Sequence, residues 1–411
     1  MRSRMRKRVV ITGIGVRSPL GNTAQDFFAN ALAGKSGIAP ITKFDPSPFP
    51  SRIAGQIQEP DSSRRPDSDH KVPNVARWSL GAARDAIQDA GLEPSGCRTA
   101  DIVLGVSISA LDGLNPEMFI EGHASQGQIQ PHDLVRLNPA FAAAWISQEL
   151  GLNGEIVNIT TACSSSTSAI GYALRLIQSG ESSCVLTGGA DEGVSPIFLG
   201  AFANAHCLSR RNNDPEHASR PFERNRDGNV QADAACIMVL EEYGHALARG
   251  ARVYAEVTGF GSAGDAAHAL KMPQSEAPGA QAIRKALRQA SREPREIDYY
   301  SALGVAHPWV DVLETRSIKA VFKEDANKLK ASSVRSMMGH PLGASGGIQT
   351  LVAAQAIRHG AVPPTINYED PDPECDLDYV PNEARALRVE HALVYTFGNG
   401  GNHSALVLSA C

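Results

Sequence analysis

A lone cysteine stands where a strand-like run turns into a helix-like run. Cys163 lies in the segment TACSSST, between the apolar run Glu155–Ile159 and the helical pattern Ser168–Ile177. The free backbone N–H groups and the dipole at a helix N-terminus favour an anion. They can therefore lower the pKa of a thiol and bind the oxyanion of a tetrahedral adduct. The segment indicates a nucleophile for acyl transfer, and the alternative interpretation is a buried structural cysteine at a tight turn.

Two further segments favour the chemical interpretation. The segment SMMGHPLGASGG places His340 in a glycine-rich turn before an apolar helix, and TFGNGGNHS, beginning at Thr396, is a strand that ends in a glycine-rich turn. A cysteine, a histidine and a glycine-rich backbone turn, each at the end of a strand, are the parts that an acyl-transfer site needs.

The composition excludes several other classes of protein. The 411 residues are 42% hydrophobic and 20% charged with a net charge of −5, which is unlike a general nucleic-acid binder. No apolar run approaches the ~20 residues of a membrane span, so no membrane partner is expected. Seven cysteines without a CxxC pair predict neither a disulfide framework nor a zinc site. We therefore expect a cytoplasmic protein whose site uses no metal.

The chain repeats itself. RVVITGIG is echoed by RVYAEVTGFG, AARDAIQDAGLEP by AIRKALRQASREP, DIVLGVSIS by IDYYSALGV, and VNITTAC by HALVYTFGNGG. Strands alternate with helices in both parts, which predicts an α/β fold made of two similar halves. We place the first half at residues 1–250, with Cys163, and the second at residues 251–411, with His340 and the glycine-rich loops.

Together with RVVITGIGVRSPLGN, GGADEGVSP, LSRRNNDPEHASRPFERNRDG and DVLETRSIKAVF, these motifs resemble the β-ketoacyl-ACP synthases. The resemblance is to the elongating type, which includes fatty-acid and type II polyketide ketosynthases, and it spans nearly the whole chain. It implies a thiolase-like five-layer αβαβα sandwich and a dimer. It also implies transfer of an acyl group from the phosphopantetheine of an acyl carrier protein to Cys163, followed by decarboxylative attack of malonyl-ACP. The phosphopantetheine arrives on the carrier protein, so no tightly bound cofactor is expected.

The resemblance also implies roles for individual residues. Two histidines donate hydrogen bonds to the developing enolate, a lysine–glutamate pair supports the site, and threonines hold the pantetheine arm. Backbone N–H groups at Cys163 and beside Phe397 form the oxyanion hole. The residues that follow the family pattern are Cys163, Asp311, Glu314, His340, Phe397, Gly398, Gly400 and Gly401.

This sequence departs from the family at the chemical centre. The first histidine position is Leu303, and the lysine–glutamate pair becomes Arg335 with Gln349. Three threonine positions and the aromatic gatekeeper of the last loop also change, to Leu270, Val305, His307 and Asn399 respectively.

These departures predict an altered reaction. Leucine cannot donate a hydrogen bond, so Leu303 is expected to impair or alter decarboxylation while leaving acyl transfer to Cys163 possible. Arg335 is expected to turn to a carboxylate such as Glu314 or to an acidic substrate. His307 either enters the pocket and partly replaces the missing histidine, or packs beside Pro308 out of reach.

We therefore expect a ketosynthase-like acyltransferase that acts with an acyl carrier protein. The alternative is a non-condensing partner subunit like the chain-length factors of type II polyketide systems, and a third possibility is a module that captures acyl thioesters without turnover. The sequence leaves open a homodimer or a heterodimer with another ketosynthase-type chain. The basic residues Arg210, Arg211, Arg220 and Arg224 either steer the acidic carrier protein or form a solvated or internally paired run.

Overall fold

The computed structural model describes residues 6–58, 72–108, 135–267 and 274–411. Leu270, one of the expected pocket residues, lies outside the described residues. In the part of the chain that is described, no helix is long and apolar enough to cross a membrane.

Ten strands form one continuous sheet whose two halves repeat the same order. From the middle outward, the first half runs β1 (Val9–Arg17), β7 (Asp233–Glu242), β6 (Cys184–Glu192), β4 (Asp101–Gly105) and β5 (Ile156–Ile159). The second half runs β8 (Ala255–Gly264), β14 (Asn402–Ser409), β13 (His391–Gly398), β9 (Tyr299–Ser301) and β10 (Lys330–Ser332). In each half the outer three strands are parallel and the inner two antiparallel, and the halves join through a short pairing of β1 with β8. The prediction of two similar halves is confirmed.

One of the sequence echoes was matched wrongly. VNITTAC begins within β5, whereas HALVYTFGNGG contains β13, and these two strands do not occupy equivalent positions in the sheet. Among the described strands, β5 lies at the edge and pairs only with β4, while β13 pairs on both sides, with β9 and β14. The topological counterpart of β13 is β6, and that of β5 is β10. Both segments are short apolar runs that end in small residues, a similarity that carries no information about the position of a strand in its sheet.

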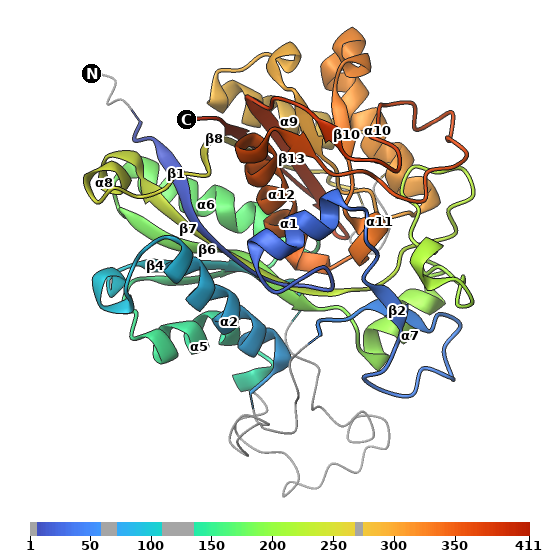
Figure 1. Cartoon of the computed structure of the whole chain (residues 1–411), viewed down its shortest axis with the longest axis horizontal. Coiled ribbons are helices and arrows are strands. Elements are labelled where there is room, and N and C mark those ends of the chain that lie inside the picture. Colours follow the sequence, from blue (N-terminus) through green and yellow to red (C-terminus); the bar gives the residue numbers. More distant parts are fainter. Residues whose placement is uncertain (1–5, 59–71, 109–134, 268–273) are drawn as a thin grey trace, which may run out of the picture.

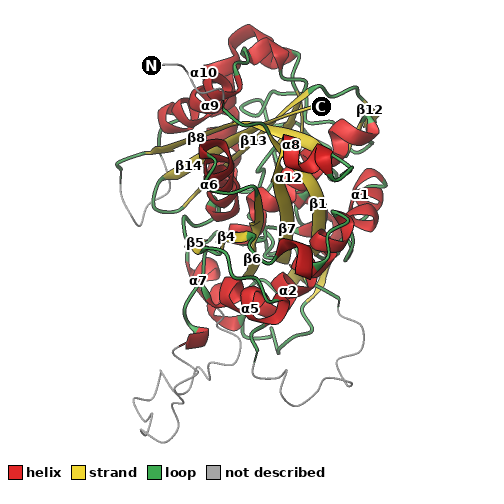
Figure 2. Cartoon of the chain, turned by 90° about the vertical axis from the view of Figure 1, so that its left-hand side faces the viewer, coloured by secondary structure: helices red, strands yellow, loops and turns green. Residues whose placement is uncertain are grey.

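Helices cover both outer faces of the sheet and fill the space between its halves (Figure 1). Helices α2 (Asn74–Asp89) and α5 (Phe141–Leu150) cover the first half, and α9 (Ala277–Ala290) and α10 (Pro308–Phe322) cover the second. Helices α6 (Ser165–Ser179) and α12 (Ser345–His359) form the middle layer. Figure 2 shows α6 between β8 and β14 on one side and β4, β5 and β6 on the other. The predicted five-layer αβαβα sandwich is confirmed.

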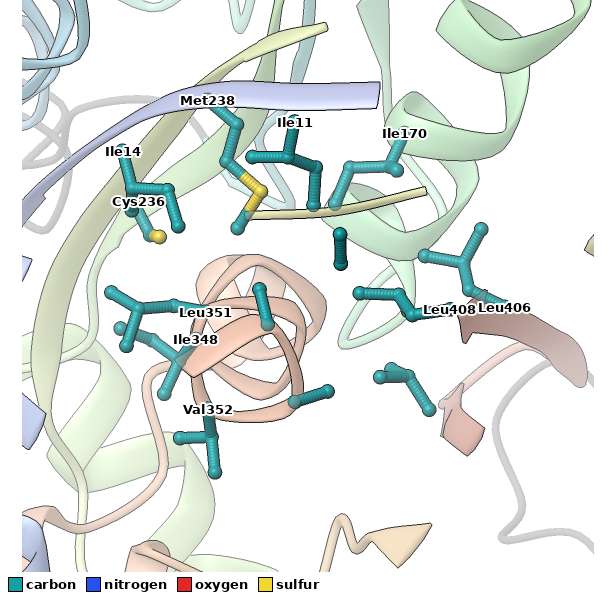
Figure 3. Packing of buried hydrophobic residues seen from close by; sticks show 14 of the residues in the cluster. Ile11, Ile14, Ile170, Cys236, Met238, Ile348, Leu351, Val352, Leu406 and Leu408 are labelled. Carbon is teal, nitrogen blue, oxygen red and sulfur yellow. The ribbon is translucent and has the colours of Figure 1, made fainter. Parts of the chain in front are cut away.

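The middle layer is the largest core. Apolar residues of α12 pack against β1, β7, α6 and β14 (Figure 3). Residues 345–356 of the helix are all buried, so it is covered on every side. Close packing of α6 against α12 needs a glycine, because a Cβ at Gly346 would lie 2.0 Å from Thr167 Oγ1. The layer is therefore built on small residues, and it fixes the N-terminal ends of α6 and α12, where Cys163 and His340 lie.

Shorter elements make up the rest of the described secondary structure. The remaining helices are α1 (Ala24–Leu32), α7 (Pro196–Asn204), α8 (Tyr243–Ala248) and α11 (Arg335–Met338), and the remaining strand pairs are β2 (Ile38–Pro40) with β3 (Ile53–Gly55) and β11 (Ala361–Val362) with β12 (Arg385–Ala386). Short 3-10 helices lie at Pro94–Cys97, Pro215–His217, Pro294–Glu296, Lys323–Asn327 and Leu342–Ala344.

Candidate active site

Cys163 sits in a tight turn between β5 and α6. The residue before it, Ala162, has a left-handed backbone with a φ of 52°. The hydroxyls of Ser164 and Ser165 donate to the carbonyls of Thr161 and Ala162, each at 2.6 Å. A non-glycine residue in this conformation costs on the order of 1–3 kcal/mol, so the surrounding hydrogen bonds must hold the turn in place. The turn fixes the direction of the Cys163 thiol.

His340 meets this thiol from the other half of the chain. Its Nε2 lies 3.2 Å from Cys163 Sγ. The backbone around His340 is anchored by its own N–H, which donates to Val230 O at 2.7 Å, and by Gly343 N–H, which donates to the buried Asp191 carboxylate at 2.5 Å. The structure thus brings together the predicted cysteine and histidine at the ends of the two middle-layer helices.

Burial keeps both groups neutral. Desolvation raises the pKa of the Cys163 thiol to about 12, with Asp191 adding to the rise and Arg335 opposing it. Desolvation and Arg335 together lower the pKa of His340 to about 3. The expectation that the helix terminus depresses the thiol pKa is therefore wrong, because the loss of water around the sulfur outweighs the favourable backbone field. At rest the pair is a thiol facing a neutral imidazole.

The glycine-rich turn closes directly over the cysteine. Gly398 ends β13, and a Cβ at this position would lie 2.7 Å from Cys163 N and 2.8 Å from Ala162 Cβ. Gly400 and Gly401, both at positive φ, then lead the chain into β14. Only glycine at position 398 lets the turn beside Phe397 approach the backbone N–H of Cys163.

A narrow cavity of about 40 Å³ opens above the thiol. It is lined by Cys163, Phe202, Asn229, Leu303, Val305, His307, Val310, His340, Phe397, Gly398 and Asn399. A cavity of this size holds only the reacting atoms of a thioester. The rest of an acyl chain must therefore lie outside it. A larger groove of about 810 Å³ between α1 and α2 contains neither Cys163 nor His340. Most of the predicted pocket residues thus line the cavity above Cys163.

Two buried carboxylates hold the loop that carries Leu303. Glu314 accepts the backbone N–H groups of Leu303 at 2.7 Å and Gly304 at 2.8 Å, and Asp311 accepts that of Val305 at 3.0 Å. Desolvation raises the pKa of Glu314 to about 7 and also raises the pKa of Asp311. The loop is thus fixed on α10, with the apolar side chains of Leu303 and Val305 against the cavity.

Arg335 lies behind the cavity wall and does not line it. Its guanidinium is fully buried and donates to the carbonyls of Ala302 at 3.1 Å and Ser345 at 3.3 Å, and to Gln349 Oε1 at 3.0 Å. Among the described residues, no carboxylate lies within ion-pair distance of it. The expectation that Arg335 turns to Glu314 is wrong, because that carboxylate is occupied by backbone N–H groups. Burial lowers the pKa of Arg335 to about 10.

His307 both packs at the start of α10 and lines the cavity, so it has features of the two arrangements that the sequence left open. It is the N-cap of α10, and its Nδ1 accepts the backbone N–H groups of Trp309 at 3.2 Å and Val310 at 3.4 Å. The same ring lines the cavity with Cys163 and His340. It is therefore not out of reach of the site.

The basic run proposed for carrier docking is mostly paired inside the molecule. Arg211 lies near Asp227, Arg220 near Glu223 and Arg224 near Asp370. Arg210 is exposed. These contacts favour the internally paired interpretation for three of the four arginines.

Some lining residues were missed by sequence reasoning. Phe202 reaches the cavity from a segment without a motif, whereas Asn229 and Val310 each lie one residue outside a motif that sequence reasoning used. Asp191 offered one signal, since it is the first of two adjacent acidic residues that end β6, a strand whose other residues are uncharged. Across the described ranges, no group of three or more His, Cys, Asp or Glu residues is placed to hold a metal ion.

Comparison with known proteins found family models and relatives that together match nearly the whole chain. Residues 6–246 match the family model of the β-ketoacyl synthase N-terminal domain, and residues 254–369 match that of the C-terminal domain. The 3-oxoacyl-[acyl-carrier-protein] synthase 2 of Coxiella burnetii is 39% identical over 98% of this chain and 99% of its own length.

Two solved structures are also similar. The ishigamide ketosynthase/chain length factor has a TM-score of 0.90 and 32% identity, covering 99% of this chain and 100% of its own. A type II polyketide synthase acyl-carrier protein in complex with its ketosynthase has a TM-score of 0.87 and 32% identity, covering 99% of this chain and 100% of its own.

Proposed function

The chain belongs to the β-ketoacyl synthase family, and we propose that it is a condensing enzyme that loads an acyl group from an acyl carrier protein onto Cys163. The single observation that carries this proposal is the 3.2 Å approach of His340 Nε2 to Cys163 Sγ. A nucleophile within hydrogen-bond distance of a base, beside backbone donors, is the arrangement that covalent acyl transfer requires.

The loading step follows from these groups. Cys163 Sγ attacks the carbonyl carbon of the donor thioester while the thiol proton passes to His340 Nε2. Because the pKa of His340 is lowered to about 3, the imidazole does not hold this proton beforehand, and transfer accompanies formation of the C–S bond. The oxyanion is held by the N–H of Cys163 and the turn at Gly398. When the adduct collapses, the pantetheine thiol leaves with the proton.

The condensing step is expected to differ from the family pattern. Leu303 is buried against the cavity and has no donor for an enolate oxygen. Loss of one such donor costs on the order of 10²–10³ in rate. We therefore propose slower decarboxylation of malonyl-ACP, or the use of a nucleophile that needs less help.

A second ketosynthase-type chain is the expected partner at β5. Among the described strands, β5 has a neighbour on one side only, and its Ile156 is 41% exposed. Such edges pair with another strand when they are not covered. A second copy and a homologous chain both fit, as the ketosynthase/chain length factor structure illustrates for that protein.

The decisive experiment is intact-protein mass after incubation with a panel of acyl-ACP donors. Native protein should gain the mass of the acyl group, and Cys163→Ala should not. No gain from any donor, with a folded native protein, would refute the loading function.

A second candidate function is a chain-length-factor-like subunit that shapes a partner's product without condensing. The observation that favours it is the apolar pair Leu303 and Val305 at the chemical centre. It predicts no acylation and a stable complex only with another chain, so native mass analysis of the purified protein separates the two candidates.

A further inference from the structure

We propose that His307 supplies the imidazole donor that Leu303 lacks, and that it stabilises the enolate oxygen of the carbon nucleophile. This inference rests on the proposed condensing function and extends it to a residue that the motif does not identify. It starts from the position of the ring, which lines the same cavity as Cys163, Leu303 and His340.

The hydrogen bonds of His307 define which nitrogen carries the proton. Nδ1 accepts the backbone N–H groups of Trp309 and Val310, the first donors of α10. A ring nitrogen that accepts these bonds has no hydrogen, so the neutral ring carries its hydrogen on Nε2. Burial and the neighbouring Arg226 lower the pKa of His307, which keeps the ring neutral. The imidazole is thus a fixed N–H donor at the wall of the cavity.

Hydrogen bonds also hold the backbone around His307. Ala306 has a φ of 62°, and Gly228 N–H donates to its carbonyl at 3.1 Å. Arg226 donates to the carbonyls of His307 at 3.4 Å and Pro308 at 2.8 Å. A donor fixed in this way costs little reorganisation when charge develops on the substrate.

His340 alone does not replace the missing donor. Its Nε2 is directed at Cys163 Sγ, so it serves the sulfur that becomes the thioester. Among the described residues, His307 is the other histidine that lines this cavity. The site thus has two imidazoles, one from the turn before α12 and one from the N-terminus of α10.

The proposed step balances as follows. In malonyl-ACP the bond between Cα and the carboxylate breaks, CO₂ leaves, and the electron pair forms an enolate whose oxygen accepts a hydrogen bond from His307 Nε2–H. The enolate carbon then attacks the acyl carbonyl on Cys163 and the C–S bond breaks. The released thiolate takes one proton from solvent, because its pKa is raised to about 12.

Two matched variants separate the donor from the helix cap. His307→Asn keeps an acceptor at the place of Nδ1 but has no atom at the place of Nε2. His307→Gln reaches the place of Nε2 but loses the capping acceptor. The rates to measure are CO₂ release from malonyl-ACP, product formation, and acylation of Cys163 by intact mass, together with the Tm.

We expect His307→Asn to keep the Tm and to lose on the order of 10²-fold in CO₂ release, a much larger loss than in acylation. His307→Gln should have a lower Tm but retain more of the CO₂ release. Leu303→His placed in the His307→Asn background should restore part of the rate.

Two results would overturn this inference. One is a His307→Asn variant whose CO₂ release equals that of the native protein, which would leave His307 a helix cap only. The other is a native protein that is acylated on Cys163 but releases no CO₂ from malonyl-ACP. Absence of acylation in the native protein would instead refute the proposed function itself.

Discussion

At the scale of single residues, the resting state of the nucleophile decides how the site reacts. The thiol of Cys163 has its pKa raised to about 12 by burial, and His340 has its pKa lowered to about 3. Since neither group is charged near neutral pH, the thiolate fraction grows tenfold with each pH unit up to about 12. We expect the rate of alkylation by iodoacetamide to rise log-linearly from about pH 6 to pH 10.

The alkylation assay has a natural control. Cys163→Ala reports the background from the exposed Cys411, since the other five cysteines are buried. A rate that levels off near neutral pH would indicate a thiolate–imidazolium pair and contradict the neutral pair described above.

Arg335 should act on the thiol through its charge. It opposes the rise in the pKa of Cys163, and Gln349 beside it offers no countercharge. Arg335→Met should therefore raise the thiol pKa further and slow alkylation at pH 9, because a pKa higher by one leaves roughly tenfold less thiolate at that pH. Arg335→Lys keeps the charge and should remain closer to the native rate. Equal rates in both variants would show that the charge has no effect on the thiol.

The sequence identified the residues of the site better than their ionisation. Cys163, His340 and Gly398 each belong to a motif, and the fold brings them together. The direction of the thiol pKa could not be predicted, because a motif shows the helix terminus but not how much water is removed from the sulfur. The pairing of Arg335 with Gln349 is present as the family pattern implied, but the contact with Glu314 was predicted wrongly, because a motif does not show that this carboxylate accepts the backbone N–H groups of a neighbouring loop.

At the scale of elements, the site depends on turns that approach one another closely. Ala162, Ala306 and Leu342 all have positive φ. They lie within two residues of Cys163, His307 and His340, respectively. Such strain persists only where the surrounding structure over-determines it. The helical pattern at Ser168–Ile177 and most of the repeats were predicted from the sequence, but the close approach of the turns was not, because it depends on the middle layer of the sandwich.

Gly398→Ala tests this close approach. The added Cβ would lie 2.7 Å from Cys163 N, so the turn or the cysteine must shift. We expect a destabilisation of about 1–3 kcal/mol and a large loss of acylation, measured by denaturant unfolding and intact mass. Gly96→Ala is the control, because nothing lies within 4 Å of its Cβ. An acylation rate equal to the native one would show that the turn does not support the oxyanion.

At the scale of the whole molecule, the duplicated halves explain where the site lies. The internal echoes predicted two similar halves, and the sheet order repeats accordingly. The echo that failed, β5 with β13, concerns strand position, which depends on pairing between distant segments. Because α6 and α12 are equivalent helices in one shared layer, their N-terminal ends bring Cys163 and His340 to the same cavity.

The outer edge of β5, which no other described strand covers, allows a test of the assembly. Ile156→Asp would place like charges near each other wherever two copies of this edge meet, and it removes an exposed apolar side chain. We expect it to convert a dimer into monomers in sedimentation velocity at micromolar concentration, with an unchanged Tm for the monomer fold.

Leu247→Asp is the control, because Leu247 is also exposed but lies on α8, beside β1 and β7 rather than β5. Since β5 leads directly into the turn of Cys163, loss of the dimer should also reduce acylation. A variant that remains a dimer would show that this edge is not the interface.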